Sequence, residues 1–343
     1  LPALRLLVTF YSSKGEYQTA HEMGEQLLSL AERAEDPLLV AVAHLMLGWN
    51  LLFLGKLAQA QAYLERVIAF YDAQQYRSPA FTYGFDHRVA CLAFASWSLW
   101  ALGYPDQALK RSQEALALAQ ELSHPLSLAF AQFFASIFQA FRRDVQLAQE
   151  LAEECIRIST EYGFPYWLAA GISLRGWALV EQGQTEAGIA QIRQGIADYQ
   201  ATGAELGRSH QLISLAEAYG KVGQVEEGLT ALDEALIIVQ RTGEGFCEPE
   251  AHRLKGELLW IQGKAEAEVE TCFQRAIKVA RQQNAKSWEL RAMMSLCRLW
   301  HSQGLQGKRE EARKRLAELY GWFTEGFDTA DLKAARTLLE ELS

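Results

Sequence analysis

Cysteine and asparagine are both scarce in this sequence of 343 residues, and each scarcity excludes a class of protein. The five cysteines form no Cys-x-x-Cys motif and no Cys/His pair at metal-ligand spacing, so neither a zinc site nor a disulfide framework is expected. The only asparagines are Asn50 and Asn284, and both Asn-Gly turns and alternating runs of β-branched residues are missing. We therefore expect an all-α fold with no metal and no cofactor.

The sequence also lacks the signals of a secreted, membrane-bound or nucleic-acid-binding protein. No secretory signal opens the chain, and the longest apolar stretch, residues 38–54, contains His44 and Asn50, which favours a buried helix over a membrane span. A formal net charge of −9 argues against nucleic acid as the main partner. Scattered cysteines fit a reducing compartment, so we expect a cytoplasmic protein. Because the chain starts with Leu and enters a helical pattern at once, we interpret it as part of a larger protein.

The sequence does contain a glycine that recurs at a nearly constant interval. These glycines are Gly15, Gly55, Gly103, Gly183, Gly223 and Gly263, and Arg143 stands halfway along the one double-length step. In most repeats a small residue stands seven positions before the turn and another stands five positions after it. Such residues let two antiparallel helices cross closely beside a tight turn, so each period predicts one helical hairpin. We expect the helices nearly to touch at Gly176 and Gly256.

This spacing predicts a right-handed superhelix (solenoid) of about eight tetratricopeptide-like hairpins with a C-terminal capping helix. The period of about 40 residues also suits HEAT and armadillo repeats, but the internal spacing of small residues and turn is typical of tetratricopeptide repeats. We treat residues 1–343 as a single repeat domain. Its expected hairpins are residues 1–35, 37–75, 79–123, 125–162, 165–202, 205–242, 248–284 and 287–324, and its expected cap is residues 329–342.

Three stretches, Ala101–His124, Glu250–Gln262 and Tyr320–Leu342, resemble a family of large bacterial signalling proteins. In that family such a segment is the C-terminal tetratricopeptide region, which follows an AAA/STAND-type ATPase module that is often joined to a class III adenylate or guanylate cyclase domain. The resemblance implies a regulatory role for this chain, with catalysis elsewhere in the parent protein. A looser similarity links the chain to the superhelical sensor domains of maltotriose-responsive transcription activators.

The sequence contains no complete catalytic motif, so we expect this chain not to be an enzyme. A Walker A loop and a Gly-x-Ser-x-Gly elbow are both absent. The segment His21–Glu25 begins like a zincin helix but has Glu25 where the second histidine must stand.

The first helix of each hairpin carries a small residue where it crosses the second helix. The residue that follows this small residue is expected to face the concave groove of the superhelix. These residues, with those three positions further on, give the candidate groove site Trp49, Trp97, Trp100, Trp177, Glu217, Glu257, Trp260 and Arg298. We hypothesise that they bind a protein or peptide segment, for example from the parent's own ATPase module, with the tryptophans as anchors. An aromatic stripe at helical spacing is also typical of core packing between hairpins, and that alternative stays open.

A long connection before residue 87 carries Phe81, Tyr83, Phe85 and Asp86. Its aromatic side chains either pack back onto the neighbouring hairpins or form a lid over the groove, and a connection of this length favours anchoring. A rival function for the whole chain is a small-molecule sensor that binds a sugar or similar effector. Such a sensor needs convergent polar groups inside a closed pocket, whereas a protein-binding groove is long and open.

Overall fold

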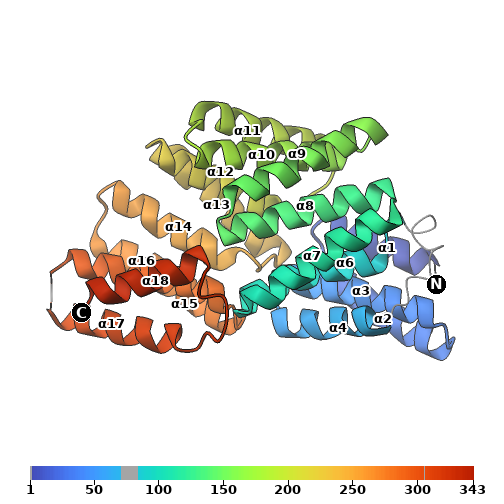
Figure 1. Ribbon diagram of the computed structural model, residues 1–343, viewed down its shortest axis with the longest axis horizontal. Coiled ribbons are helices and arrows are strands. Elements are labelled where there is room, and N and C mark those ends of the chain that lie inside the picture. Colours follow the sequence, from blue (N-terminus) through green and yellow to red (C-terminus); the bar gives the residue numbers. More distant parts are fainter. Residues whose placement is uncertain (1, 71–83, 305) are drawn as a thin grey trace.

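The computed structural model describes residues 2–70, 84–304 and 306–343, and in these residues it contains seventeen α-helices and no β-strand (Figure 1). The predicted all-α superhelix is confirmed. The helices pair into antiparallel hairpins: α1 (Pro2–Ser13) with α2 (Tyr17–Arg33), α3 (Pro37–Phe53) with α4 (Leu57–Phe70), α6 (His87–Leu102) with α7 (Pro105–Leu122), α8 (Pro125–Arg142) with α9 (Val145–Tyr162), α10 (Pro165–Glu181) with α11 (Thr185–Ala201), α12 (Arg208–Lys221) with α13 (Val225–Thr242), α14 (Glu248–Ile261) with α15 (Glu266–Gln282), and α16 (Lys286–Ser302) with α17 (Gln306–Tyr320). The last helix is α18 (Ala330–Glu341). None of the described helices is long and apolar enough to cross a lipid bilayer.

Each hairpin turns through a residue whose backbone is left-handed. The six glycines of the sequence period have φ angles between +71° and +96°, a region in which a Cβ atom is strained. The fourth hairpin is the exception, because Arg143 holds this conformation there with a φ of +63°. The period read from the sequence is therefore a period of tight turns.

The two helices of a hairpin cross where the small residues stand, as expected. A Cβ atom on Gly176 in α10 would lie 2.7 Å from the carbonyl oxygen of Gly188 and 2.8 Å from the amide nitrogen of Ile192, so backbone meets backbone at this crossing. A Cβ atom on Gly256 in α14 would lie 2.6 Å from the ring of Phe273. Small residues are therefore required at these positions for the helices to pack at this distance.

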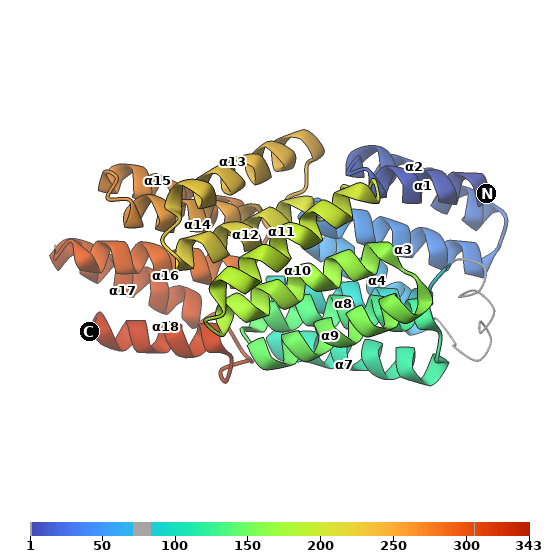
Figure 2. The same cartoon turned by 90° about the horizontal axis from the view of Figure 1, so that it is seen from above.

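The superhelix is wound so tightly that its successive turns touch. The turn of the first hairpin meets the loop between α11 and α12, where the Glu205 amide donates to the Ser13 carbonyl at 2.9 Å. The turn of the second hairpin meets the loop between α13 and α14, where the Gly245 amide donates to the Phe53 carbonyl at 2.8 Å. Figure 2 shows the C-terminal end of α13 beside α1 and α2, although these elements are far apart in the sequence.

The third hairpin continues this pattern against the C-terminal hairpin and the segment before α18 (Figure 1). The Ser287 hydroxyl donates to the Trp100 carbonyl across the contact. The Glu325 carboxylate accepts from the first amides of α7, Asp106 at 3.0 Å and Gln107 at 3.1 Å, and so caps the N-terminus of that helix from another superhelical turn. These polar contacts fix the pitch of the superhelix.

The turn glycines differ according to whether another superhelical turn lies against them. A Cβ atom on Gly103 would lie 2.5 Å from the ring of Trp322 and 2.9 Å from the Cβ atom of Lys286. No described atom lies within 4 Å of such a Cβ atom on Gly183 or Gly223, whose hairpins belong to the second superhelical turn. Gly103 thus allows the left-handed hairpin turn and also leaves room for the superhelical turn that packs against it.

We predict that Gly103→Ala destabilises the protein more than Gly183→Ala does. Both changes impose left-handed strain of about 1–2 kcal/mol, but only Gly103→Ala also overpacks an inter-turn contact, which adds about 1–3 kcal/mol. Denaturant unfolding of the two variants measures the difference directly. Equal losses of unfolding free energy would mean that the inter-turn contact contributes nothing to stability.

Candidate functional site

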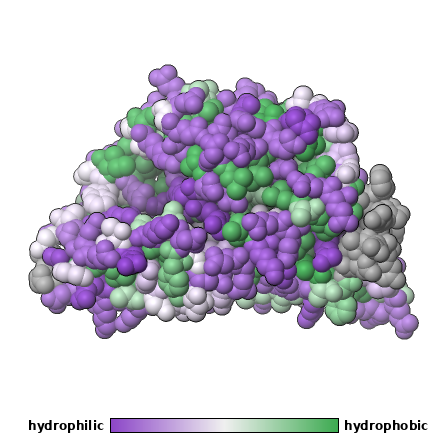
Figure 3. Space-filling model, viewed as in Figure 1, coloured by the Kyte–Doolittle hydropathy of each residue, from purple (hydrophilic) through white to green (hydrophobic). Residues whose placement is uncertain are grey.

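The axis of the superhelix holds two adjoining chambers, which together we name the axial cavity. The first, the aromatic chamber, has a cavity volume of about 50 Å³. Its wall is largely apolar and includes the aromatic residues Trp97, Phe133, Phe134, Trp177, Tyr199 and Phe246. The second, the charged chamber, shares Trp177, His210, Ser214 and Cys247 with the first and adds Arg143, Glu217, Glu250 and Arg291. The face of the molecule shown in Figure 3 is mostly hydrophilic, with hydrophobic patches between the polar residues.

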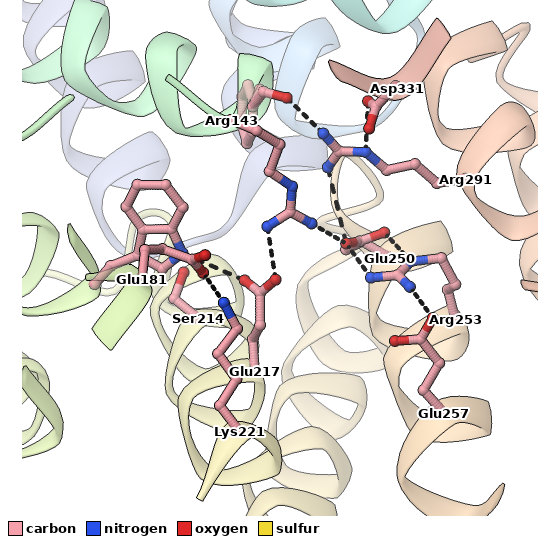
Figure 4. A network of polar contacts seen from close by, with 12 residues as sticks. Arg143, Glu181, Ser214, Glu217, Lys221, Glu250, Arg253, Glu257, Arg291 and Asp331 are labelled. Atoms are coloured by element: carbon pink, nitrogen blue, oxygen red, sulfur yellow. Dashed lines mark hydrogen bonds and ion pairs between the residues drawn. The ribbon is translucent and has the colours of Figure 1, made fainter. Parts of the chain in front are cut away.

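A network of ion pairs crosses the charged chamber and joins four hairpins and the cap (Figure 4). Arg143, from the α8–α9 turn, donates to Glu217 of α12 at 2.7 Å. Arg253 of α14 donates twice to Glu250, each time at 2.7 Å, in a bidentate pair. Its third contact is Glu257, one helical turn further along α14.

Arg291 of α16 connects this network to the cap and to the end of α8. Its guanidinium pairs with Asp331 of α18 at 2.8 Å and donates to the Phe141 carbonyl at the end of α8. The same guanidinium lies over the rings of Trp100, at 5.1 Å, and Trp288, at 5.2 Å, in cation–π geometry. One arginine therefore holds three segments of the superhelix against one another.

The network carries an excess of negative charge, because three guanidinium groups (Arg143, Arg253 and Arg291) face four carboxylates (Glu217, Glu250, Glu257 and Asp331). The charged states of Glu217 and Arg143 are favoured. Burial raises the pKa of Glu217, but the charge and hydrogen bond of Arg143 outweigh it and lower that pKa to about 2. In turn, the Glu217 carboxylate raises the pKa of Arg143.

Arg143 differs from the other turn residues of the sequence period because it is not a glycine. A non-glycine residue at this turn costs about 1–2 kcal/mol of backbone strain. The strain is retained where its side chain pairs with Glu217 and lies 4.0 Å from Glu250. The missing glycine of the fourth hairpin was therefore the sequence signal for Arg143, beside the register that predicted Glu217 and Glu257. Nothing in the sequence pattern pointed to Arg253 or Arg291.

A buried carboxyl group without a cation lies in the wall of the aromatic chamber. Glu244, in the loop between α13 and α14, is 2% exposed, accepts from the Ser209 hydroxyl at 2.8 Å and from the Tyr17 hydroxyl at 3.4 Å, and forms no ion pair in the described part of the chain. Burial raises the pKa of Glu244 to about 7, although these two hydrogen bonds lower it in part. Glu244 therefore changes charge close to neutral pH.

Four of the five tryptophans of the predicted groove, Trp49, Trp97, Trp100 and Trp177, are buried, with exposed fractions of 3–7%. Trp97 stacks on Phe246 with the ring centres 5.6 Å apart, and Trp100 stacks on Phe141 at 4.8 Å. Trp97 and Trp100 thus pack between superhelical turns, and Trp49 stacks on Phe94 of the neighbouring hairpin at 5.8 Å, as in the core-packing alternative. Their binding of a partner stays a prediction.

The remaining predicted groove residues divide into two groups. Glu217 and Glu257 join the ion-pair network, and the Trp177 indole donates to Glu217 at 3.3 Å. Trp260 is half-buried at the margin of the C-terminal core, and Arg298 is exposed, so neither lines the axial cavity.

The predicted loop is described only in part, since Phe81 and Tyr83 lie outside the described residues. Phe85 stacks on Phe130 with the ring centres 4.9 Å apart, and the Asp86 carboxylate caps α6 by accepting from the Val89 amide at 2.9 Å. Both contacts are those of an anchored connection rather than of a lid. Across the described residues, no group of three His, Cys, Asp or Glu side chains is placed to hold a metal ion.

Comparisons with known proteins agree with the repeat fold. A family model described as tetratricopeptide repeat matches residues 1–73. The chain is 22% identical over 287 residues to an uncharacterised protein of Rhizobium meliloti (strain 1021), an alignment that covers 82% of this chain and 27% of that protein. The chain thus spans about a quarter of that relative's length.

Two solved structures resemble the chain over nearly all its residues. A Rap protein complexed with competence and sporulation factor has a TM-score of 0.62 at 11% identity, with 99% of this chain and 96% of that chain covered. A Signal Transduction ATPase with Numerous Domains (STAND) from Pyrococcus horikoshii, a protein with a tetratricopeptide repeat sensor, has a TM-score of 0.49 at 13% identity and is covered over 50% of its length. At these identities the likeness concerns the fold alone.

We predict that Arg143→Gln lowers the free energy of unfolding by about 2 kcal/mol, because it leaves the buried Glu217 carboxylate without its charged partner. The matched control is Arg157→Gln, since Arg157 also pairs with two carboxylates, Glu154 and Glu161, but on the exposed face of α9. That control should not measurably change stability. Urea unfolding of both variants distinguishes a structural network from ordinary surface pairing, and equal effects would count against the network.

The raised pKa of Glu244 predicts that the free energy of unfolding depends on pH. Because its folded pKa lies above the ordinary value, its contribution is complete at acid pH below the ordinary pKa and is lost as pH rises through about 7. Glu244→Gln, which stays neutral, should therefore gain about 2–3 kcal/mol relative to the unmodified protein between pH 5 and pH 8. Urea unfolding at both pH values measures this gain, and a constant difference between the two proteins would show that Glu244 does not titrate there.

Proposed function

We propose that this chain is a non-catalytic regulatory module of a larger cytoplasmic protein and that it binds a protein or peptide segment. Supporting this proposal are the repeat fold and the relative of which the chain covers only 27%. The Rap protein of the same fold was solved with a bound factor, competence and sporulation factor. Neither nucleic acid nor a membrane is proposed as a partner, since the chain carries a net charge of −9 and no described helix suits a bilayer.

The observation that carries the proposal is the contact between superhelical turns. The axis is enclosed by Trp97, Trp100 and Phe246 and bridged by Arg143 and Arg291, so a partner segment enters it only when the turns separate. A partner that binds the open form more tightly shifts the population from closed to open. Binding and opening of the superhelix are thereby coupled, which is what a regulatory module requires.

The partner segment that we propose belongs to the parent protein itself. In the bacterial signalling family that these stretches resemble, an AAA/STAND-type ATPase module precedes such a region, often with a cyclase domain. In this arrangement the closed superhelix and the ATPase module compete for the same contacts. Opening of the superhelix then alters nucleotide turnover in the parent.

A second candidate function is a small-molecule sensor, with a sugar or similar effector bound in the axial cavity. It is favoured by one observation: the aromatic chamber is partly enclosed and polar groups of His210, Gln211 and Ser214 converge on it. Such an enclosed site with few polar groups is typical of small-molecule binding. In this function the effector, rather than a protein segment, selects between the closed and open forms.

Measurement of ATP hydrolysis by the full-length parent protein tests the proposed function. Arg143→Gln, which weakens closure, should change the hydrolysis rate several-fold, whereas Arg157→Gln on the exposed face of α9 should leave it unchanged. An unchanged rate with Arg143→Gln, or a parent without nucleotide hydrolysis, would contradict the proposal.

A further inference from the structure

Three hydrogen-bond donors in the wall of the aromatic chamber are already used within the protein. The Trp97 indole donates to the Phe134 carbonyl at 3.1 Å, and the Trp177 indole donates to Glu217 at 3.3 Å. The Tyr199 hydroxyl donates to the Leu206 carbonyl at 2.6 Å. These three aromatic side chains therefore offer a ligand their ring faces and no free donor.

The acceptors on one side of the chamber remain available. The ring of His210, in the wall shared by both chambers, makes no hydrogen bond in the described structure, and burial lowers its pKa to about 4, so it is a neutral imidazole at pH 7. Gln211, which is 9% exposed, has a side-chain oxygen without a hydrogen-bond partner. Glu244 supplies a carboxyl group that forms no ion pair with any cation of the described residues.

The charges that line the cavity also favour a cation. The charged chamber is balanced, because Arg143 and Arg291 face Glu217 and Glu250. Ionised Glu244 adds one negative charge in the wall of the aromatic chamber. Aromatic faces combined with this carboxylate favour a cation over a neutral or anionic ligand.

We propose that the aromatic chamber binds a small organic ammonium ion. Its apolar body lies against the rings of Trp97, Phe134, Trp177 and Phe246, and its N–H groups donate to acceptors at the start of α12 and in the loop that carries Glu244. The inference rests on the small-molecule sensor function proposed above and names the chemistry of its effector.

The surroundings of Glu244 make it the group whose ionisation controls such binding near neutral pH. The titratable groups that face it are Tyr17 of α2, Tyr199 of α11 and Cys247 at the start of α14. Burial raises the pKa of each of these three groups well above its ordinary value, so all are neutral between pH 6 and pH 8. Affinity for an ammonium ion is therefore expected to rise over this range as Glu244 loses its proton.

Three probes of similar shape test the inference by calorimetry at pH 8: 2-phenylethylamine, 2-phenylethanol and phenylacetate. The amine should bind about tenfold more tightly than the alcohol, because it adds a cation–π contact and a charge-assisted hydrogen bond, and the carboxylate should bind most weakly. Equal binding of the amine and the alcohol would overturn the ammonium inference and leave the sensor function standing. Absence of binding by all three would remove the aromatic chamber as a ligand site, and the sensor function with it.

The variant Glu244→Gln identifies the group responsible. It should remove the preference for the amine and the rise in affinity from pH 6 to pH 8, while the alcohol binds unchanged. Glu318→Gln is the matched control, because Glu318 is exposed on α17 and its loss changes the net charge equally. If both variants kept the preference for the amine, Glu244 would not be its source and the proposal would fail. A thermal melt of each variant confirms that it is folded.

Discussion

The rest of this structure depends on the contact between successive turns of the superhelix. A hairpin repeat specifies only its own crossing and its contacts with its neighbours. Here the turns of the first four hairpins also meet segments of the sixth to eighth hairpins and of the cap, through backbone hydrogen bonds such as Gly245 to Phe53 and through side chains such as Glu325. These contacts turn an extended ribbon into a closed body with an axial cavity.

The contact between superhelical turns changes the role of the side chains along the axis. Tryptophans that would be exposed anchors in an open groove become buried packing, and the indole donors of Trp97 and Trp177 are satisfied within the protein, whereas the Trp49 indole has no hydrogen-bond partner among the described residues. Charged residues that would be a solvated rim become a network in which each guanidinium is held by carboxylates. Breaking such a buried network leaves unpaired charge, so the closed form is favoured as a unit.

Much of the fold could be predicted from the sequence because its signals are local. Glycine at a left-handed turn and small residues at crossings such as Gly176 act within one hairpin, and so does the register that turns Glu217 and Glu257 toward the axis. The burial of the tryptophans could not be predicted, because it depends on the angle between hairpins summed over a full superhelical turn. For the same reason, the repeat period does not predict that Arg143 pairs with Glu217 or that Glu244 has no ion pair.

Amide hydrogen exchange at Glu205 and Gly245 tests the central claim most directly. Both residues lie outside the helices, and their amides donate only across the contact between superhelical turns, to Ser13 and Phe53. If the superhelix is closed in solution, these two amides should exchange slowly, like amides in the middle of the neighbouring helices. Rapid exchange at both, with the helices still protected, would show that the turns do not touch.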